Sequence, residues 1–79
     1  MYKEVEDFIK NKEVEKFVEW TSTHTIEKED WNRFLCVAAY TGCVEAVEIC
    51  LKNGADDVEL AQLNAEKTGQ QLKITIPKK

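Results

Sequence analysis

The sequence predicts an all-α protein: a short solenoid of about five helices in antiparallel pairs, with an extended, strand-like tail at its C-terminal end. Three observations support this prediction. Apolar residues recur at the i, i+3, i+4 spacing of one helix face in successive segments. Short breaks at Gly and Asn separate these segments. A pattern of helix, turn and helix also recurs at a period of about thirty residues.

Length and composition predict one small domain that spans residues 1–79. The chain is 43% hydrophobic and 33% charged, which is too apolar for a disordered protein. A chain of this size buries only about 60–65% of its unfolded surface. We therefore expect marginal stability.

The first two helices follow from one apolar spacing, which occurs in the segments 5–9 and 14–18. The pair Asn11-Lys12 interrupts the pattern between them, and Asn is a tolerable helix stop. Residues 21–25 are polar and partly β-branched, which predicts a loop.

The third helix is predicted to be the most buried, because its segment 34–39 is almost continuously apolar. Asp30 is a suitable N-cap for a helix that runs to Tyr40, and Thr25 is an alternative start. Gly42 interrupts the pattern after this helix.

Two further helices are expected between Gly42 and Gly69. The segment 44–51 carries one apolar stripe, formed by Val44, Val47 and Leu51, and Gly54 follows it. Asp56 and Glu59 have the spacing of a capping box for the fifth helix. The residues of that helix expected to face inward are Leu60, Leu63, Ala61 and Ala65.

The segment 72–76 alternates apolar and polar residues, which is the period of a strand, and Pro77 limits it to an edge. Its apolar face either folds back over the open end of the solenoid or adds a strand to the sheet of a partner. We favour the first alternative, because a bare apolar end of a solenoid aggregates.

The internal repeat is visible by direct comparison of segments. At an offset of thirty, residues 12–18 match residues 42–48, with a Val and a Glu at equivalent positions. At an offset of twenty-seven, residues 38–42 find a weaker match in residues 65–69. Such a period is typical of stacked helical hairpins.

Residues 33–56 resemble an ankyrin repeat. The matching positions are Leu35, Ala38-Ala39, Gly42, Val44-Glu45, Val47, Leu51 and Asn53-Gly54-Ala55-Asp56. The resemblance divides the chain into a degenerate first repeat (1–25), a central repeat (26–56), and a partial capping repeat with the tail (57–79). Arg33-Phe34-Leu35-Cys36 replaces the family's Thr-Pro-Leu-His signature. The first repeat lacks the Gly turn, and a tail replaces the last helix.

The resemblance implies binding of a protein partner, because the first helix of each pair lines the concave surface in this family. The residues that would then face the partner are Asn32, Arg33, Tyr40 and Thr41. His24 and Lys28 would lie on the rim. Trp31 is a further candidate, because Trp, Tyr and Arg are enriched at binding hot spots. Core packing is the alternative for both Trp31 and Trp20, and plain helix surface is the alternative for Arg33 and Tyr40.

Charge argues against a nucleic-acid partner. The net charge is −4, the chain has one Arg, and no basic stripe is present. Most of the acid lies in residues 1–30, which contain nine Asp and Glu against five Lys. This acidic face serves solubility or docks a basic partner. No apolar run approaches the ~20 residues of a membrane span.

Chemistry by the side chains themselves is not expected. Three cysteines, Cys36, Cys43 and Cys50, cannot all pair within the chain, and no signal peptide is recognisable. We therefore expect a reduced, cytoplasmic protein. With His24 they make only a weak metal-binding pattern, and an exposed Cys43 thiol is a redox alternative. We expect no enzyme activity, catalytic residue, metal, cofactor or small-molecule substrate.

The sequence thus predicts a module that binds a protein partner sterically through its concave helical surface. Its size suits a small adaptor or inhibitor, such as one encoded by a virus or phage, that is monomeric when free. The first alternative is a structural or accessory subunit of a larger assembly. A minor alternative is a metal or redox protein based on the cysteines and the histidine.

Overall fold

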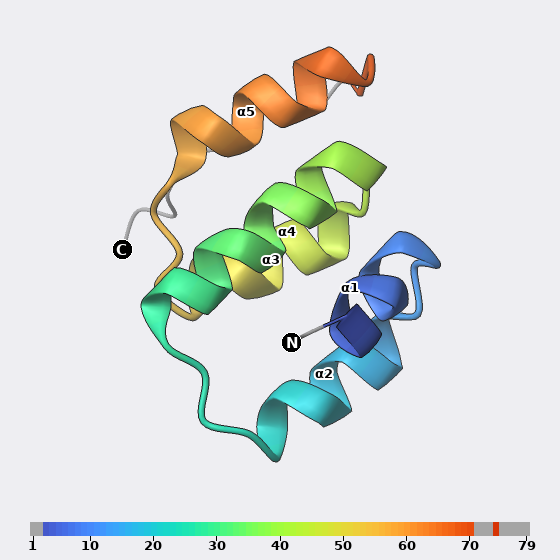
Figure 1. Cartoon of the computed structure of the whole chain (residues 1–79), viewed down its shortest axis with the longest axis vertical. Helices are drawn as coiled ribbons and strands as arrows, with labels where there is room; N and C mark the ends of the chain where they lie inside the picture. The colour runs from blue at the N-terminus through green and yellow to red at the C-terminus, as the bar shows by residue number, and fades with distance from the viewer. Residues whose placement is uncertain (1–2, 71–73, 75–79) are drawn as a thin grey trace.

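The computed structural model describes residues 3–70 and residue 74. Over these residues the chain forms five α-helices and no strand (Figure 1). The helices are α1 (Lys3–Lys10), α2 (Val14–Ser22), α3 (Lys28–Thr41), α4 (Val44–Lys52) and α5 (Val58–Lys67). The prediction of an all-α fold with five helices is confirmed for this part of the chain.

Helix α3 is the centre of the molecule. It contacts α1, α4 and α5, while α2 contacts α1 and α4. Figure 1 shows α5 and α1 on opposite sides of α3, with α4 behind it. The Cα radius of gyration is 11.3 Å, close to the ~11.6 Å expected for a compact chain of this length. The central helix is also the one that buries the most residues, as predicted for the segment 34–39.

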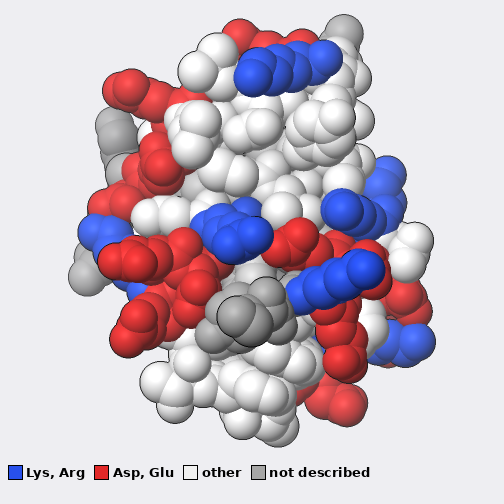
Figure 2. Space-filling model, in the orientation of Figure 1, with Lys and Arg blue, Asp and Glu red and all other residues white. Residues whose placement is uncertain are grey.

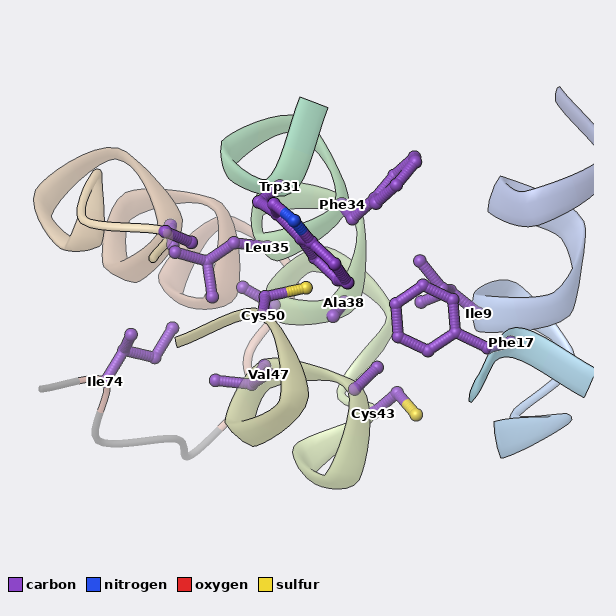
Figure 3. Close-up of a cluster of buried hydrophobic side chains, with 14 of the residues drawn as sticks. Ile9, Phe17, Trp31, Phe34, Leu35, Ala38, Cys43, Val47, Cys50 and Ile74 are labelled. Atoms are coloured by element: carbon purple, nitrogen blue, oxygen red, sulfur yellow. The ribbon is translucent and has the colours of Figure 1, made fainter. Parts of the chain in front are cut away.

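Aromatic rings fill the core between α2 and α3. Phe17 meets Phe34 edge-on with ring centroids 5.9 Å apart, and Trp31 meets both rings at 6.3 and 6.0 Å. Figure 3 shows Phe17 reaching from α2 toward the side chains of α3. Fully buried alanines at 38, 39, 61 and 65 allow the helices to approach closely. Edge-to-face packing of this kind adds about 0.5–1.5 kcal/mol per pair beyond burial.

Helix α3 ends in a Schellman motif. Gly42 has a positive φ of 79°, and the N–H of Cys43 then donates to the carbonyl of Ala38 at 2.9 Å. This bond satisfies a carbonyl that the helix leaves open at its end. Glycine adopts such a backbone conformation without the steric cost that a Cβ brings, so the predicted stop at Gly42 is confirmed.

The same hydrogen bond recurs at the offsets found in the sequence. Thirty residues earlier, after α1, the N–H of Glu13 donates to the carbonyl of Phe8 at 2.8 Å. Twenty-seven residues later, after α5, the N–H of Gln70 donates to the carbonyl of Ala65 at 2.8 Å. In the first case the left-handed residue is Lys12, with a φ of 58°. The same bond also follows α4, from the N–H of Ala55 to the carbonyl of Cys50 at 3.0 Å, so it is a common helix ending in this protein and forms after α1 even without a glycine.

The predicted cap of α3 was wrong. The helix begins at Lys28 after Glu27, and neither Asp30 nor Thr25 occupies its first boundary. The main-chain N–H of Asp30 already donates to the carbonyl of Glu27 at 3.0 Å. Asp30 therefore lies inside the first turn, where a carboxylate is as well placed near the positive helix end as it is at the cap.

The predicted loop over residues 21–25 is shorter than expected. Helix α2 runs to Ser22, so the polar residues Thr21 and Ser22 belong to its last turn. The hydroxyl of Thr21 donates to the carbonyl of Val18 at 2.9 Å, and that of Ser22 to the carbonyl of Glu19 at 2.7 Å. These bonds satisfy the two hydroxyl groups within the helix.

The predicted capping box of α5 is absent. Asp57 is the N-cap residue and makes no side-chain capping bond. The Asp56 carboxylate instead pairs with Lys28 and accepts from the Asn32 amide. A contact between distant segments has replaced the local one.

Two inward-facing predictions for α5 were also wrong. Leu60 is 48% exposed and Leu63 is 53% exposed, whereas Ala61 and Ala65 are fully buried as predicted. Helix α5 packs mainly against one neighbour, α3, so only a narrow stripe of it is covered. Val44 at the start of α4 is likewise 46% exposed.

Of the predicted strand, only Ile74 lies within the described residues, and it is not in a strand. Its side chain is 6% exposed and belongs to the hydrophobic core, as Figure 3 shows. Its N–H donates to the side-chain oxygen of Gln62 on α5 at 3.0 Å. At this residue the chain folds back on the helices. The rest of the predicted strand lies outside the described residues.

Candidate protein-binding surface

Helix α3 carries four of the residues predicted to face a partner. Arg33 and Tyr40 are exposed, while Asn32 and Thr41 are half-buried. Some of these side chains already form hydrogen bonds within the protein. Fewer of them are therefore available to a partner than the sequence predicts.

Asn32 is fully used inside the molecule. Its side-chain oxygen accepts from the main-chain N–H groups of Asp56 and Asp57, at 2.8 and 3.0 Å. Its amide nitrogen donates to the Asp56 carboxylate at 3.3 Å. This side chain ties the turn before α5 to α3, so it positions the surface rather than offering itself to a partner.

Arg33 links α3 to α1. Its Nε donates to the Glu6 carboxylate at 3.1 Å, although 65% of the Arg33 side chain stays exposed. An exposed pair of this kind contributes about 0–1 kcal/mol to folding. Arg33 can therefore exchange this contact for one with a partner at little cost.

Tyr40 is the largest exposed aromatic side chain among the described residues, with 53% of its surface open. Its main-chain carbonyl accepts from the hydroxyl of Thr68 at 2.9 Å, which holds the ends of α3 and α5 together. Thr41 beside it donates its hydroxyl to the carbonyl of Val37 at 3.0 Å. The Tyr40 ring is thus presented on a rigid backbone.

Trp31 lies in the core rather than on the surface. Its side chain is only 7% exposed and packs edge-on against Phe17 and Phe34. This position agrees with core packing, which is the alternative to partner binding given above for Trp31. Trp20 is half-buried and meets Phe34 edge-on at 6.4 Å.

The two predicted rim residues lie at opposite ends of the loop between α2 and α3. The His24 ring stacks on Trp20 with centroids 3.9 Å apart, and its Nδ1 donates to the Trp20 carbonyl at 2.8 Å. Lys28 pairs with Asp56. This contact with the Lys28 ammonium, with help from the Asn32 amide, lowers the pKa of the Asp56 carboxyl.

A shallow groove lies between the first halves of α3 and α5. Its lining is Glu29, Asp30, Asn32, Arg33, Cys36, Asp57 and Leu60. The sequence does not predict Leu60 as a surface residue, because the helical period places it in the core. Leu60 is exposed because no second helix covers α5 on this side, and a local sequence pattern does not indicate such a neighbour. The acidic residues are not predicted as a binding site either, because their positions are equally typical of helix caps and of a general acidic surface.

The thiols are poorly suited to nucleophilic chemistry. Burial raises the pKa of Cys36, and the negative charge of Asp57 raises it further. Burial also raises the pKa of Cys50, which is fully enclosed. Cys43, the proposed exposed thiol, is only 2% exposed. All three cysteines are free, and the thiolate form required of a nucleophile is disfavoured at Cys36 and Cys50.

No family model, curated protein or solved structure matches the chain. Among the described residues, no three Cys, His, Asp or Glu side chains form a group that could hold a metal ion. Within the same residues, no helix has both the length and the apolar character needed to cross a membrane.

Proposed function

We propose that this protein is an interaction module that binds a protein partner sterically through the outer surface of α3 and α5. In this proposal it is an adaptor or inhibitor without chemistry of its own. The observation that carries the proposal is the exposure of Tyr40 and Leu60, at 53% and 48%, on two helices that hydrogen bonds lock together. Exposed apolar side chains on a rigid frame are typical of binding surfaces.

We further propose an ankyrin-like architecture, in which α1, α3 and α5 are the first helices of three successive repeats. The contacts support it, since α1 and α5 both pack against α3, and α2 packs against α4. Figure 1 is consistent with it, because α1, α3 and α5 follow one another across one face.

A permanent subunit of a larger assembly is the second candidate. It is favoured by the outer face of α5, where Leu63 is 53% exposed and lines a second shallow pocket with Val58 and Ile74. Such an apolar edge at the end of a stack of helices can be covered by another protein. In the first candidate the partner contacts both α3 and α5, and in the second it contacts the outer face of α5 and Ile74.

Site-specific photocrosslinking tests the proposal. Benzoylphenylalanine is placed at Tyr40, at Leu63 or at Val44, each in the full chain, and the protein is irradiated in the cells that produce it. We expect one adduct of defined mass from position 40 and none from position 44. Val44 is the matched control, because it is 46% exposed but belongs to α4, which lies behind α3 in Figure 1.

In the second measurement, the Tyr40→Ala variant or the unmodified chain is added as a competitor that reduces crosslinking to the partner. We expect the variant to compete at least tenfold less well than the unmodified chain, with an unchanged melting temperature. An adduct from position 63 with none from position 40 would favour the assembly subunit. Equal adducts from positions 40 and 44 would contradict both candidates.

A further inference from the structure

The groove between α3 and α5 carries an uneven distribution of charge. Arg33, a lining residue, pairs weakly with Glu6 on α1, and Lys28 nearby pairs with Asp56. The carboxylates of Glu29, Asp30 and Asp57 remain. In the part of the chain that the structure describes, none of these three takes part in an ion pair. Figure 2 shows acidic side chains gathered where α3 and α5 begin.

The other half of the same surface is uncharged. Leu60 and the half-buried Cys36 lie in the groove next to the carboxylates. Tyr40 follows Cys36 by one helical turn, on the same face of α3. Figure 2 shows this uncharged area over α5 and the adjoining part of α3. The surface formed by α3 and α5 is therefore acidic where the two helices begin and apolar farther along them.

The distance between the acidic end and the apolar end of this surface corresponds to a certain length of extended peptide. Glu29 and Tyr40 are eleven positions apart on one helix, which corresponds to ~16 Å along its axis. An extended peptide covers that distance in about five residues. A segment lying along the groove would therefore place one side chain at the carboxylates and another, about five residues away, against the Tyr40 ring.

We propose that this groove binds an extended segment of a partner protein that carries a Lys or Arg about five residues from an aromatic or large aliphatic side chain. This inference rests on the proposed binding function and specifies its partner. The basic side chain lies among Glu29, Asp30 and Asp57, and the apolar side chain packs on Leu60 and Tyr40. Complementary charge sets the orientation of the segment and excludes acidic segments.

Charge also argues against a second copy of this chain as the occupant. A two-fold symmetric contact places the same patch on both sides, so the three unpaired carboxylates of one copy would oppose those of the other. The chain has a basic end of its own, Lys78-Lys79, which the test must therefore include as a competitor.

Selection from a library of random dodecapeptides tests the proposal directly. The full chain is immobilised, and enriched peptides are sequenced against a parallel selection on the Tyr40→Ala/Leu60→Ala variant. We expect peptides enriched only on the unmodified chain, with Lys or Arg four to six residues from Phe, Tyr, Trp or Leu. A selected peptide is then synthesised and its affinity is measured at two salt concentrations.

Charge-neutralising variants identify the carboxylates. Glu29→Gln/Asp57→Asn should weaken the selected peptide about tenfold at low salt and reduce the salt dependence of its binding. The matched control is Glu45→Gln/Glu48→Gln, which changes the net charge equally and alters exposed carboxylates on α4, one of them also in a first helical turn. It should leave the affinity within twofold. Circular dichroism and the melting temperature confirm that each variant is folded.

The possible failures are distinguishable. Peptides that depend on Tyr40 and Leu60 but show no basic preference would overturn this inference and leave the proposed function standing. No enrichment above the Tyr40→Ala/Leu60→Ala variant would overturn both. Enrichment only after Lys78→Glu/Lys79→Glu would identify the chain's own end as the occupant. Self-association of the chain in low salt that Tyr40→Ala abolishes would identify a second copy. Either of these last results would overturn the inference.

Discussion

The side-chain oxygen of Asn32 accepts hydrogen bonds from two main-chain N–H groups in the turn that precedes α5. This turn begins twenty-four residues away in sequence. Those N–H groups belong to Asp57 and to Asp56, for which the sequence predicts a local capping role. A single amide thereby determines where α5 begins relative to α3. The groove between these helices depends on this contact, because Asp57 is part of its lining.

Replacing Asn32 with Ala should lower the free energy of unfolding by about 1–2 kcal/mol, because two N–H groups lose their acceptor. The measurement is denaturation by urea, followed by circular dichroism. Asn64→Ala is the matched control, since the Asn64 amide donates only to the carbonyl of Leu60 in its own helix. Both changes raise helix propensity equally. Equal stabilities of the two variants would show that the contact between α3 and α5 contributes nothing.

Lys12 provides a second test at the level of one residue. It adopts the left-handed conformation, with a φ of 58°, in the turn after α1, as Gly42 does in the turn after α3. A side chain is strained there, so Lys12→Gly should stabilise the protein by roughly 0.5–1 kcal/mol. Lys10→Gly, inside the last turn of α1, should instead destabilise it by about 1 kcal/mol. Thermal unfolding of both variants checks the sign. Destabilisation by Lys12→Gly would contradict the turn geometry.

At the scale of elements, the face that each helix buries depends on how many neighbours it has. Helix α3 packs closely against three helices, receives the ring of Phe17 from α2, and buries five residues, whereas α5 buries only two alanines. Helix α4 lies between these cases, with Val47 buried and Val44 exposed. Substitutions on the two sides of one helix should therefore differ sharply.

Val47→Asp should unfold the chain, because Val47 is 5% exposed and the new carboxylate would be buried without a partner. The whole domain is expected to have only about 4–12 kcal/mol of stability. Val44→Asp should stay folded, since that side chain is 46% exposed at the start of α4, where an acid is favourable. Circular dichroism at room temperature distinguishes them. A folded Val47→Asp protein would refute the packing of α4 on α3.

Ile74 tests whether the end of the chain contributes to folding. Its side chain lies in the core and is 6% exposed. Ile74→Ala should cost about 2 kcal/mol of stability, whereas Leu63→Ala, at a 53% exposed position of α5, should change it by less than about 0.5 kcal/mol. Urea denaturation of the full chain measures both. If the two variants are equally stable, Ile74 does not cap the helices.

At the scale of the whole molecule, charge and exposed apolar surface have opposite effects on association. The chain carries a net charge of −4, and its exposed large apolar residues lie on more than one helix. Repulsion between copies opposes the association that Tyr40 and Leu60 would otherwise favour.

We therefore expect a 9.1 kDa monomer at micromolar concentration in low salt, as measured by sedimentation velocity. High salt screens the repulsion and should increase any self-association, and Tyr40→Ala should reverse that increase. A stable dimer in low salt that is unaffected by Tyr40→Ala would show that another surface mediates contact between copies.

The sequence by itself determined the features that depend on neighbouring residues. Helical periodicity and the glycine stops predicted five helices and the turn at Gly42, because both arise from backbone geometry within one or two turns. The recurring pattern of helix, turn and helix likewise predicted where one helix ends and the next begins, since this too depends on residues within one or two turns.

The tertiary structure alone decided which side of each helix faces water and which polar groups meet. Leu60 lies at a position that the helical period assigns to the core, yet it is exposed because no second helix covers α5 on that side. Asn32 and Arg33 are adjacent polar residues, yet one is used within the fold and the other forms a weak pair with Glu6. Such outcomes depend on the position of distant segments, and a local pattern contains no information about them.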